Sequence, residues 1–197
     1  MVFTPLETPR LVLRRFQDRD LPAFVEYRND PEVARYQSWD SISAPRAQTF
    51  IQEQKKVEPG IPGQWFQFAA ELKASGALAG DLGLCVTVLD ARQAQLGVTF
   101  AREHQHHGLA TEAMTAVLDF AFINLDLHRV IAIVDAENSA SARLMGRVGL
   151  RREGHFLKNT WFKEHWSDEF LFAVLQAEWL PRRAAQAAAG AKAGAGV

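Results

Sequence analysis

A continuous apolar run from Val130 to Val134 directly follows a segment with the apolar spacing of a helix, and this order of a helix and a buried strand constrains the fold most. Between Leu109 and Leu125, apolar residues recur at helical spacing, which is typical of a helix with one buried face. A strand that is apolar at every position is buried on both of its faces, as the strands of parallel sheets are. Together with the preceding strand, these segments predict a strand–helix–strand unit within one sheet.

The residues before and after this unit read as further strands and helices. Short turn-rich gaps at Ser75-Gly76 and at residues 90–92 separate successive strands, which predicts an antiparallel meander. Asn138 opens another helix, and Gly149 ends it. The predicted strands are 11–16, 65–72, 78–88, 94–101, 129–134, one that begins at 150, and 170–175; the predicted helices cover 21–27, 45–57, 109–125 and 138–149.

Length and element order together predict one α/β domain. At roughly 150 residues per domain, a chain of 197 residues makes a single domain. We predict that this domain spans residues 1–181 and holds a mixed central sheet flanked by helices, with an antiparallel N-terminal meander and a parallel pair in the middle. Residues 182–197 are rich in Ala and Gly, so we expect them to form a flexible tail.

Composition and charge exclude several functional classes. The net charge of −1 provides no basic field for a nucleic-acid backbone, so we predict no nucleic-acid partner. The first residues contain no basic region followed by an apolar run, and no apolar stretch is long enough to span a bilayer, so we predict neither a signal peptide nor a membrane association. A single cysteine, Cys85, excludes an intrachain disulfide framework and fits a cytoplasmic location.

The segment from Glu103 to Glu112 carries the clearest chemical signal. It is a polar loop with a glycine, Gly108, and it opens the helix that begins near Leu109. The first N–H groups of a helix have no partner within the helix and lie at the positive end of its dipole, so they can bind a phosphate or pyrophosphate. The alternative is a plain helix start with a turn glycine.

Histidines in the same loop raise the question of a metal site. His104, His106 and His107 lie close together, but no second ligand motif accompanies them and no His-Glu-x-x-His spacing occurs. We therefore predict no metal site.

Six groups of residues, in order along the chain, resemble motifs of one family. They are Thr8–Arg14, Gln105-His106-His107-Gly108-Leu109-Ala110 with Thr111-Glu112-Ala113, His128-Arg129-Val130, Asn138–Ser141, Gly149–Gly154 and Trp166-Ser167-Asp168. The second group resembles the Gln/Arg-x-x-Gly-x-Gly/Ala signature of the GCN5-related N-acetyltransferase superfamily, in the version found in its ribosomal-protein N-terminal acetyltransferase branch. The resemblance extends over about residues 6–180.

This resemblance implies a GCN5-related acetyltransferase fold and acetyl-coenzyme A as cosubstrate. In that fold the strands 94–101 and 129–134 splay apart, which leaves main-chain groups free for the amides of the cofactor's pantetheine arm. A main-chain N–H near Phe100 would polarise the thioester carbonyl. Asn138 would contact the cofactor or serve as a plain helix cap. The implied cofactor-binding residues are Phe100, Gln105, His106, His107, Gly108, Leu109, Ala110, Thr111 and Asn138.

The resemblance also implies direct attack of a free amine on the thioester. Many family members have a tyrosine in the helix after Asn138 that protonates the leaving thiolate, and this chain has Met145 there. Ser141 is therefore our candidate acid, with a helix-capping role as the alternative.

The base that takes the proton of the amine is less constrained. Many relatives have a Glu two residues before the strand glycine, where this chain has Gln95. We name Glu103 as the candidate base, and Asp135, Glu137 or water alone as alternatives.

Aromatic residues of the early helices and the late loop are candidates for the acceptor pocket, because the family places the acceptor between the early helices and the late strands. Each of them could instead belong to the core. The candidates are Tyr36, Trp39, Trp65, Trp161 and Trp166.

The predicted function is the direct transfer of an acetyl group from acetyl-coenzyme A to a primary amine, either a protein N-terminus or a small-molecule amine such as a polyamine or an aminoglycoside. The alternative is a coenzyme-A-binding sensor or scaffold without catalysis, to which the departures at Gln95 and Met145 give some weight. By analogy with the family, the chain could form a homodimer.

Overall fold

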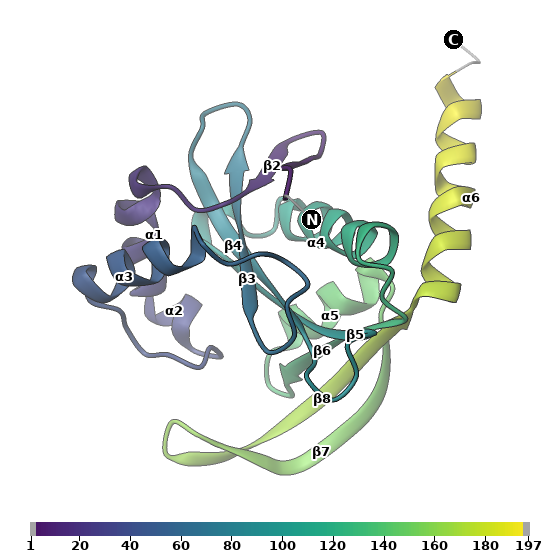
Figure 1. The fold of residues 1–197 in the computed structure, drawn as a ribbon. Helices are drawn as coiled ribbons and strands as arrows, with labels where there is room; N and C mark the ends of the chain where they lie inside the picture. The colour runs from purple at the N-terminus through teal and green to yellow at the C-terminus, as the bar shows by residue number, and fades with distance from the viewer. Residues whose placement is uncertain (1–2, 195–197) are drawn as a thin grey trace.

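The computed structural model describes residues 3–194, and its strands form one eight-stranded sheet in the order β1-β2-β3-β4-β5-β6-β8-β7 (Figure 1). The predicted mixed sheet is confirmed, because β5 and β6 are parallel and all other neighbouring strands are antiparallel. The strands are Leu6–Glu7 (β1), Leu11–Arg14 (β2), Trp65–Leu72 (β3), Leu78–Val86 (β4), Gln93–Phe100 (β5), Arg129–Asp135 (β6), Arg151–Phe162 (β7) and His165–Leu175 (β8).

The helices begin and end at residues with recognisable capping roles. Ser43 accepts a hydrogen bond from the N–H of Arg46 at the start of α3, and Gly149 ends α5 with a φ of 100°. The segment predicted as one helix over 109–125 is an α-helix followed by a π-helical turn, Phe120–Asn124. The helices are Leu21–Arg28 (α1), Pro31–Ala34 (α2), Ala44–Gln54 (α3), Leu109–Asp119 (α4), Ser139–Val148 (α5) and Gln176–Gly194 (α6).

Two hydrophobic clusters lie on opposite faces of the sheet. On β3, Phe68 and Ala70 belong to the larger cluster, which also contains Met114 of α4, whereas Ala69 belongs to a smaller cluster with Phe24 of α1. Successive residues of a strand point to opposite faces, so α4 covers one face and the early helices cover the other.

The parallel strands β5 and β6 separate soon after they meet. They pair only where Gln93–Gln95 lie opposite Arg129–Ile131, although β5 continues to Phe100 and β6 to Asp135. The splayed pair that the resemblance implies is therefore present, and it leaves a gap in the middle of the sheet.

The C-terminal strands are longer than predicted. β7 and β8 form a hairpin that extends beyond the body of the molecule (Figure 1), and β8 begins at His165 rather than at Phe170. Most side chains of β7 are exposed, so this part of the sequence carries no alternating apolar pattern. Trp166, which we expected before the last strand, lies within it.

Helix α6 runs across the predicted domain boundary after residue 181. Trp179 is buried and donates from Nε1 to Asp119 Oδ1 at 2.7 Å, and Arg183 binds the same carboxylate. Arg182 donates to the carbonyls of Val148 and Gly149. The first residues of the predicted tail are thus attached to the domain, while the rest of α6 points away from it (Figure 1). Residues 195–197 lie outside the described residues.

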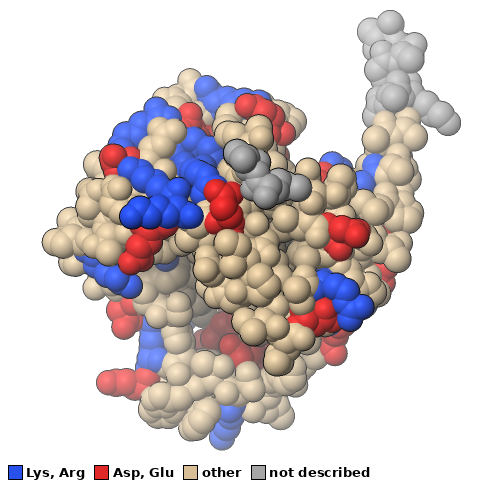
Figure 2. Space-filling model, in the orientation of Figure 1, with Lys and Arg blue, Asp and Glu red and all other residues tan. Residues whose placement is uncertain are grey.

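The surface carries both signs of charge. On the face drawn in Figure 2, basic and acidic side chains lie close to one another, in keeping with the net charge of −1. Among residues 3–194, none of the helices has an apolar stretch long enough to cross a membrane.

Candidate active site

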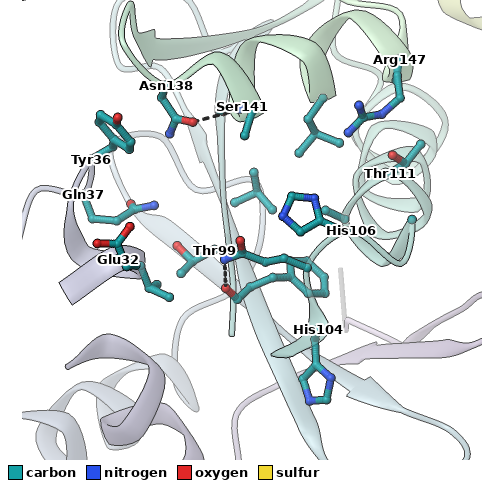
Figure 3. Close-up of a pocket in the computed structure, with 18 residues that line it drawn as sticks. Glu32, Tyr36, Gln37, Thr99, His104, His106, Thr111, Asn138, Ser141 and Arg147 are labelled. Carbon is teal, nitrogen blue, oxygen red and sulfur yellow. Dashed lines mark hydrogen bonds between the residues drawn. The ribbon is translucent and has the colours of Figure 1, made fainter. Parts of the chain in front are cut away.

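A cavity of about 470 Å³ lies beside the gap between β5 and β6 (Figure 3). Four segments of the chain line it. They are α2 with the turn after it (Glu32, Val33, Tyr36 and Gln37), the end of β5 (Val98, Thr99 and Phe100), the loop into α4 (His104, Gln105, His106, Gly108, Ala110 and Thr111) and α5 with its cap (Asn138, Ala140, Ser141, Leu144 and Arg147).

The end of β5 turns main-chain groups toward this cavity. The N–H of Ala101 donates to the carbonyl of Ala79 on β4, so main-chain groups at odd positions of β5 pair with β4. Main-chain groups alternate sides along a strand, so those of Val98 and Phe100 face the side from which β6 has diverged.

Gln105 forms a hydrogen bond with one of these main-chain groups. Its side-chain amide donates from Nε2 to the carbonyl oxygen of Phe100 at 2.9 Å. This bond ties the loop before α4 to the end of β5 and leaves the N–H of Phe100 for a ligand.

The loop into α4 presents a row of unpaired N–H groups. His106 has a φ of 63° and Gly108 has a φ of 78°, so the main chain turns sharply twice before the helix begins. Within residues 3–194, none of the N–H groups from His106 to Thr111 donates to a protein acceptor. Such a loop at a helix N-terminus forms an anion-binding concavity, as the sequence predicts.

The N-terminal segment holds this loop in place. Arg10 donates from Nη1 to the carbonyl of His107 at 2.8 Å and pairs with Glu112 at 2.7 Å, and the hydroxyl of Thr8 donates to the same carboxylate. Partial burial raises the pKa of Glu112, but the hydrogen bonds from Thr8 and Arg10 outweigh this effect and hold the pKa below its ordinary value.

Asn138 and Ser141 lie together at the start of α5 (Figure 3). The side-chain oxygen of Asn138 accepts from the N–H of Ser141 at 3.0 Å, so Asn138 acts as a helix cap. The Ser141 hydroxyl lines the cavity and makes no hydrogen bond within the described part of the chain. Met145, at the position where many family members have a tyrosine, is 2% exposed and belongs to the core. Ser141 is therefore the residue of this helix that brings a hydroxyl to the cavity.

A buried ion pair fixes α1 on the sheet and thereby positions the α2 wall of the cavity. Asp81 of β4 accepts from the hydroxyl of Tyr27 and from Nη2 of Arg28 at 3.0 Å, and all three residues are buried. Burial raises the pKa of the Tyr27 hydroxyl well above its ordinary value. The Trp39 ring centroid lies 3.7 Å from the Arg28 guanidinium, and Trp39 Nε1 donates to the Arg28 carbonyl.

The structure brings one of the predicted acceptor residues into the cavity. Trp161 and Trp166 contact each other across the β7–β8 hairpin, with ring centroids 5.6 Å apart and exposures of 60% and 54%. Trp65 is partly exposed at the start of β3. Tyr36 lines the cavity, whereas Trp39, Trp65, Trp161 and Trp166 do not.

The candidate base Glu103 lies outside this cavity. Its carboxylate is 3.2 Å from His104 Nε2 and lines a separate, smaller cavity with Glu26 and Asp30. Asp135 accepts from the N–H of Glu137, and neither residue lines the larger cavity.

Of the predicted cofactor residues, two do not line the cavity. Leu109 is 5% exposed and packs in the core, and His107 contributes its carbonyl to Arg10 instead. The other seven do line it, and they come from three separate segments. Among residues 3–194, no group of three or more potential metal ligands is found.

Several lining residues are absent from the predicted set. Glu32 reaches the cavity from α2, Gln37 from the turn after it and Arg147 from α5, and Thr99 flanks the main-chain groups of β5 (Figure 3). Nothing in the local pattern around them indicates a site, because the tertiary fold alone brings these helices together.

Comparisons with known proteins agree with this geometry. Residues 10–151 match a family model described as an acetyltransferase (GNAT) domain. The uncharacterized N-acetyltransferase YnaD of Bacillus subtilis (strain 168) is 31% identical over 174 residues, which cover 88% of this chain and 98% of that protein.

Solved structures show the same fold. An acetyltransferase of the GNAT family from Bacillus anthracis matches with a TM-score of 0.79 and 28% identity, over 89% of this chain and 100% of that chain. The spermidine N-acetyltransferase from Vibrio cholerae, solved with CoA and spermine, matches with a TM-score of 0.74 and 23% identity, over 86% of this chain and 98% of that chain.

Proposed function

This chain belongs to the GNAT family of acetyltransferases, and we propose that it transfers the acetyl group of acetyl-coenzyme A directly to a primary amine that binds beside α2. One observation carries the proposal. The unpaired main-chain groups of Val98, the N–H of Phe100, the free N–H groups before α4 and the Ser141 hydroxyl all meet at one cavity.

The residues present fit acetyl-coenzyme A. A pantetheine arm carries amides that need main-chain partners, and Val98 offers an N–H and a carbonyl on the side where β6 has diverged. A pyrophosphate needs several N–H donors, which the segment from His106 to Thr111 supplies. Gly108 leaves room for a bulky anion, since a Cβ there would meet only Arg10 Nη2, at 3.5 Å.

Acetyl-coenzyme A supplies an acetyl thioester, which the amine nitrogen attacks and from which the thiolate leaves. The N–H of Phe100 would donate to the thioester carbonyl oxygen, where negative charge develops. The Ser141 hydroxyl would pass its proton to the leaving sulfur, because it lines the same cavity and has no other partner in the described residues. Water in the cavity would take the proton that the attacking nitrogen loses and return one to the serine oxygen, so that the products are the amide and the free thiol.

The acceptor enters from the other side of the cavity. Figure 3 shows Glu32, Tyr36 and Gln37 on the α2 side, opposite Arg147 and Thr111. This arrangement separates a wall suited to an amine from a wall suited to phosphates. The relative from Vibrio cholerae is named for its action on spermidine, which supports a small amine as the acceptor.

Finer assignments stay predictions from the sequence. The motifs favour the ribosomal-protein N-terminal acetyltransferase branch, whose acceptors are protein N-termini. The homodimer and the cytoplasmic location rest on family analogy and on the single cysteine.

The test is the release of coenzyme A thiol from acetyl-coenzyme A, with and without amines. The panel contains spermidine, an aminoglycoside and N-terminal peptides of ribosomal proteins, and mass spectrometry identifies the acetylated product. We expect release that depends on one class of amine. Tight cofactor binding in calorimetry without release from any amine would instead support a coenzyme-A-binding module.

A further inference from the structure

Glu32 is the one carboxylate among the described residues that line the cavity. It lies in the first turn of α2, where its N–H donates to Asp30, and its side chain is exposed to the solvent that enters the cavity. Within residues 3–194 its carboxylate makes no salt bridge with Lys, Arg or His. A negative charge at the acceptor wall therefore has no partner in the described part of the protein.

The cations beside α2 have other contacts, and Arg147 lies on the opposite side of the cavity (Figure 3). Arg35 lies over the Tyr36 ring at 5.1 Å from its centroid, and Arg102 pairs with Asp30 at 3.7 Å. Lys163, at the tip of the β7–β8 hairpin, pairs with Asp40 at 2.9 Å and donates to the carbonyl of Ala34. A ligand with a positive charge is therefore the natural partner of Glu32.

The reacting amine itself is a poor match for this carboxylate. An amine attacks a thioester only when it is unprotonated, and an adjacent carboxylate stabilises the protonated form of an amine. A carboxylate at the acceptor wall therefore favours the reaction most when it binds a different cationic group of the same acceptor.

We propose that Glu32 selects acceptors that carry a second positive charge in addition to the reacting amine. This inference rests on the proposed acetyl transfer. It names the acceptor class as aliphatic diamines and longer polycationic amines, and it assigns Glu32 a role in specificity through an ion pair at the open side of the cavity.

The experiment compares two acceptors of equal chain length, 1,4-diaminobutane and n-butylamine, by kcat/KM in the thiol-release assay. Only the unprotonated amine reacts, and the second charge of the diamine lowers the pKa of its amine groups, so each kcat/KM value is expressed per concentration of unprotonated amine. An exposed ion pair is worth at most about 1 kcal/mol, so we expect wild type to prefer the diamine about fivefold. Salt screens such a pair, so the preference declines in 0.5 M NaCl.

Variants at Glu32 test the role of its charge. In Glu32→Gln the ratio between the two acceptors should fall to about one, and in Glu32→Lys the monoamine should become the better acceptor. Glu53→Gln is the matched control, because Glu53 is an exposed carboxylate on α3 outside the cavity, and it should keep the wild-type ratio. Thermal melts establish that all three variants fold.

A wild-type ratio near one, or a ratio that Glu32→Gln and Glu32→Lys leave unchanged, would overturn the inference while leaving acetyl transfer intact. Acetylation of neither amine nor any member of the wider panel would instead count against the proposed function. The two failures are thus distinguishable.

Discussion

Substitution of Gly80 by alanine should disturb the strand end on which the proposed cofactor site depends. Gly80 lies on β4 opposite Phe100. A Cβ at this position would lie 2.3 Å from the carbonyl oxygen of Thr99 and 2.7 Å from the Cα of Phe100. Both contacts are with main-chain atoms, so no side-chain rotation relieves them and β5 must move.

The size of the effect follows from how β5 is held. Ordinary contacts begin above 3 Å, so the end of β5 must shift by roughly 1 Å, and β4 is its sheet neighbour there because β6 has diverged. Overpacking of this kind costs about 1–3 kcal/mol. For a chain of this length we therefore expect Tm to fall by about 4–8 °C, taking a loss near 2 kcal/mol. A displacement of that size at the reacting groups should also lower kcat/KM for acetyl-coenzyme A at least about tenfold.

Gly97→Ala is the matched control. Gly97 lies on β5 itself, but nothing lies within 4 Å of a Cβ built there, so its Tm should stay within about 2 °C of wild type. Calorimetric melts and urea unfolding measure stability, and the thiol-release assay measures KM and kcat. If Gly80→Ala kept both the Tm and the KM of wild type, the argument that this strand end cannot move would be wrong.

Three further substitutions test other parts of the molecule. Ser141→Ala should lower kcat about 10- to 100-fold with little change in KM for acetyl-coenzyme A, and an unchanged kcat would exclude the proton-donor role. Asp81→Ala should cost about 3–5 kcal/mol in urea unfolding, because it leaves Arg28 buried without its partner. Glu112 has a lowered pKa, so its contribution to stability is complete above the ordinary carboxyl value of 4.5 and is lost as the pH falls through the lowered one. The deficit of Glu112→Gln should therefore be largest at neutral pH and should narrow in acid, and a deficit that did not change between pH 7 and pH 3 would contradict this.

The helices and strands of the core could be predicted from sequence because their buried positions carry apolar residues at the spacing of a helix or a strand. The strand 65–72 and the start of the helix at Leu109 match the structure to the residue. The apolar run at Val130 forms the predicted strand, but the expectation that both of its faces are buried is wrong, because Val130, Ala132 and Val134 are buried while Ile133 on the other face is 40% exposed. Strand β7 and the start of β8 left no such pattern, since most side chains of β7 and the first two of β8 are exposed. The continuation of α6 to residue 194 could not be predicted either, because the Ala- and Gly-rich composition of a projecting helix is the same as that of a flexible tail.

The candidate site shows the same division. The loop before α4 is a local segment, so Gln105 and Gly108 were recognisable from its resemblance to the family signature. Glu32 and Arg147 reach the cavity only because α2 and α5 fold toward it, and no sequence period records that approach. The hairpin carries Trp161 and Trp166 outside the cavity for a similar reason: strand length and register, which sequence predicts poorly, decide where its tip lies.

The unpaired stretch of β5 has a consequence for how such a protein can diversify. Main-chain groups are the same in every residue except proline, so a strand that binds its ligand through them recognises the acyl donor independently of side-chain identity. The opposite wall works through Glu32, Tyr36 and Gln37, where each substitution alters what an acceptor meets. Under the proposed function, one half of the site tolerates sequence drift while the other half can acquire a new acceptor preference by a few point mutations.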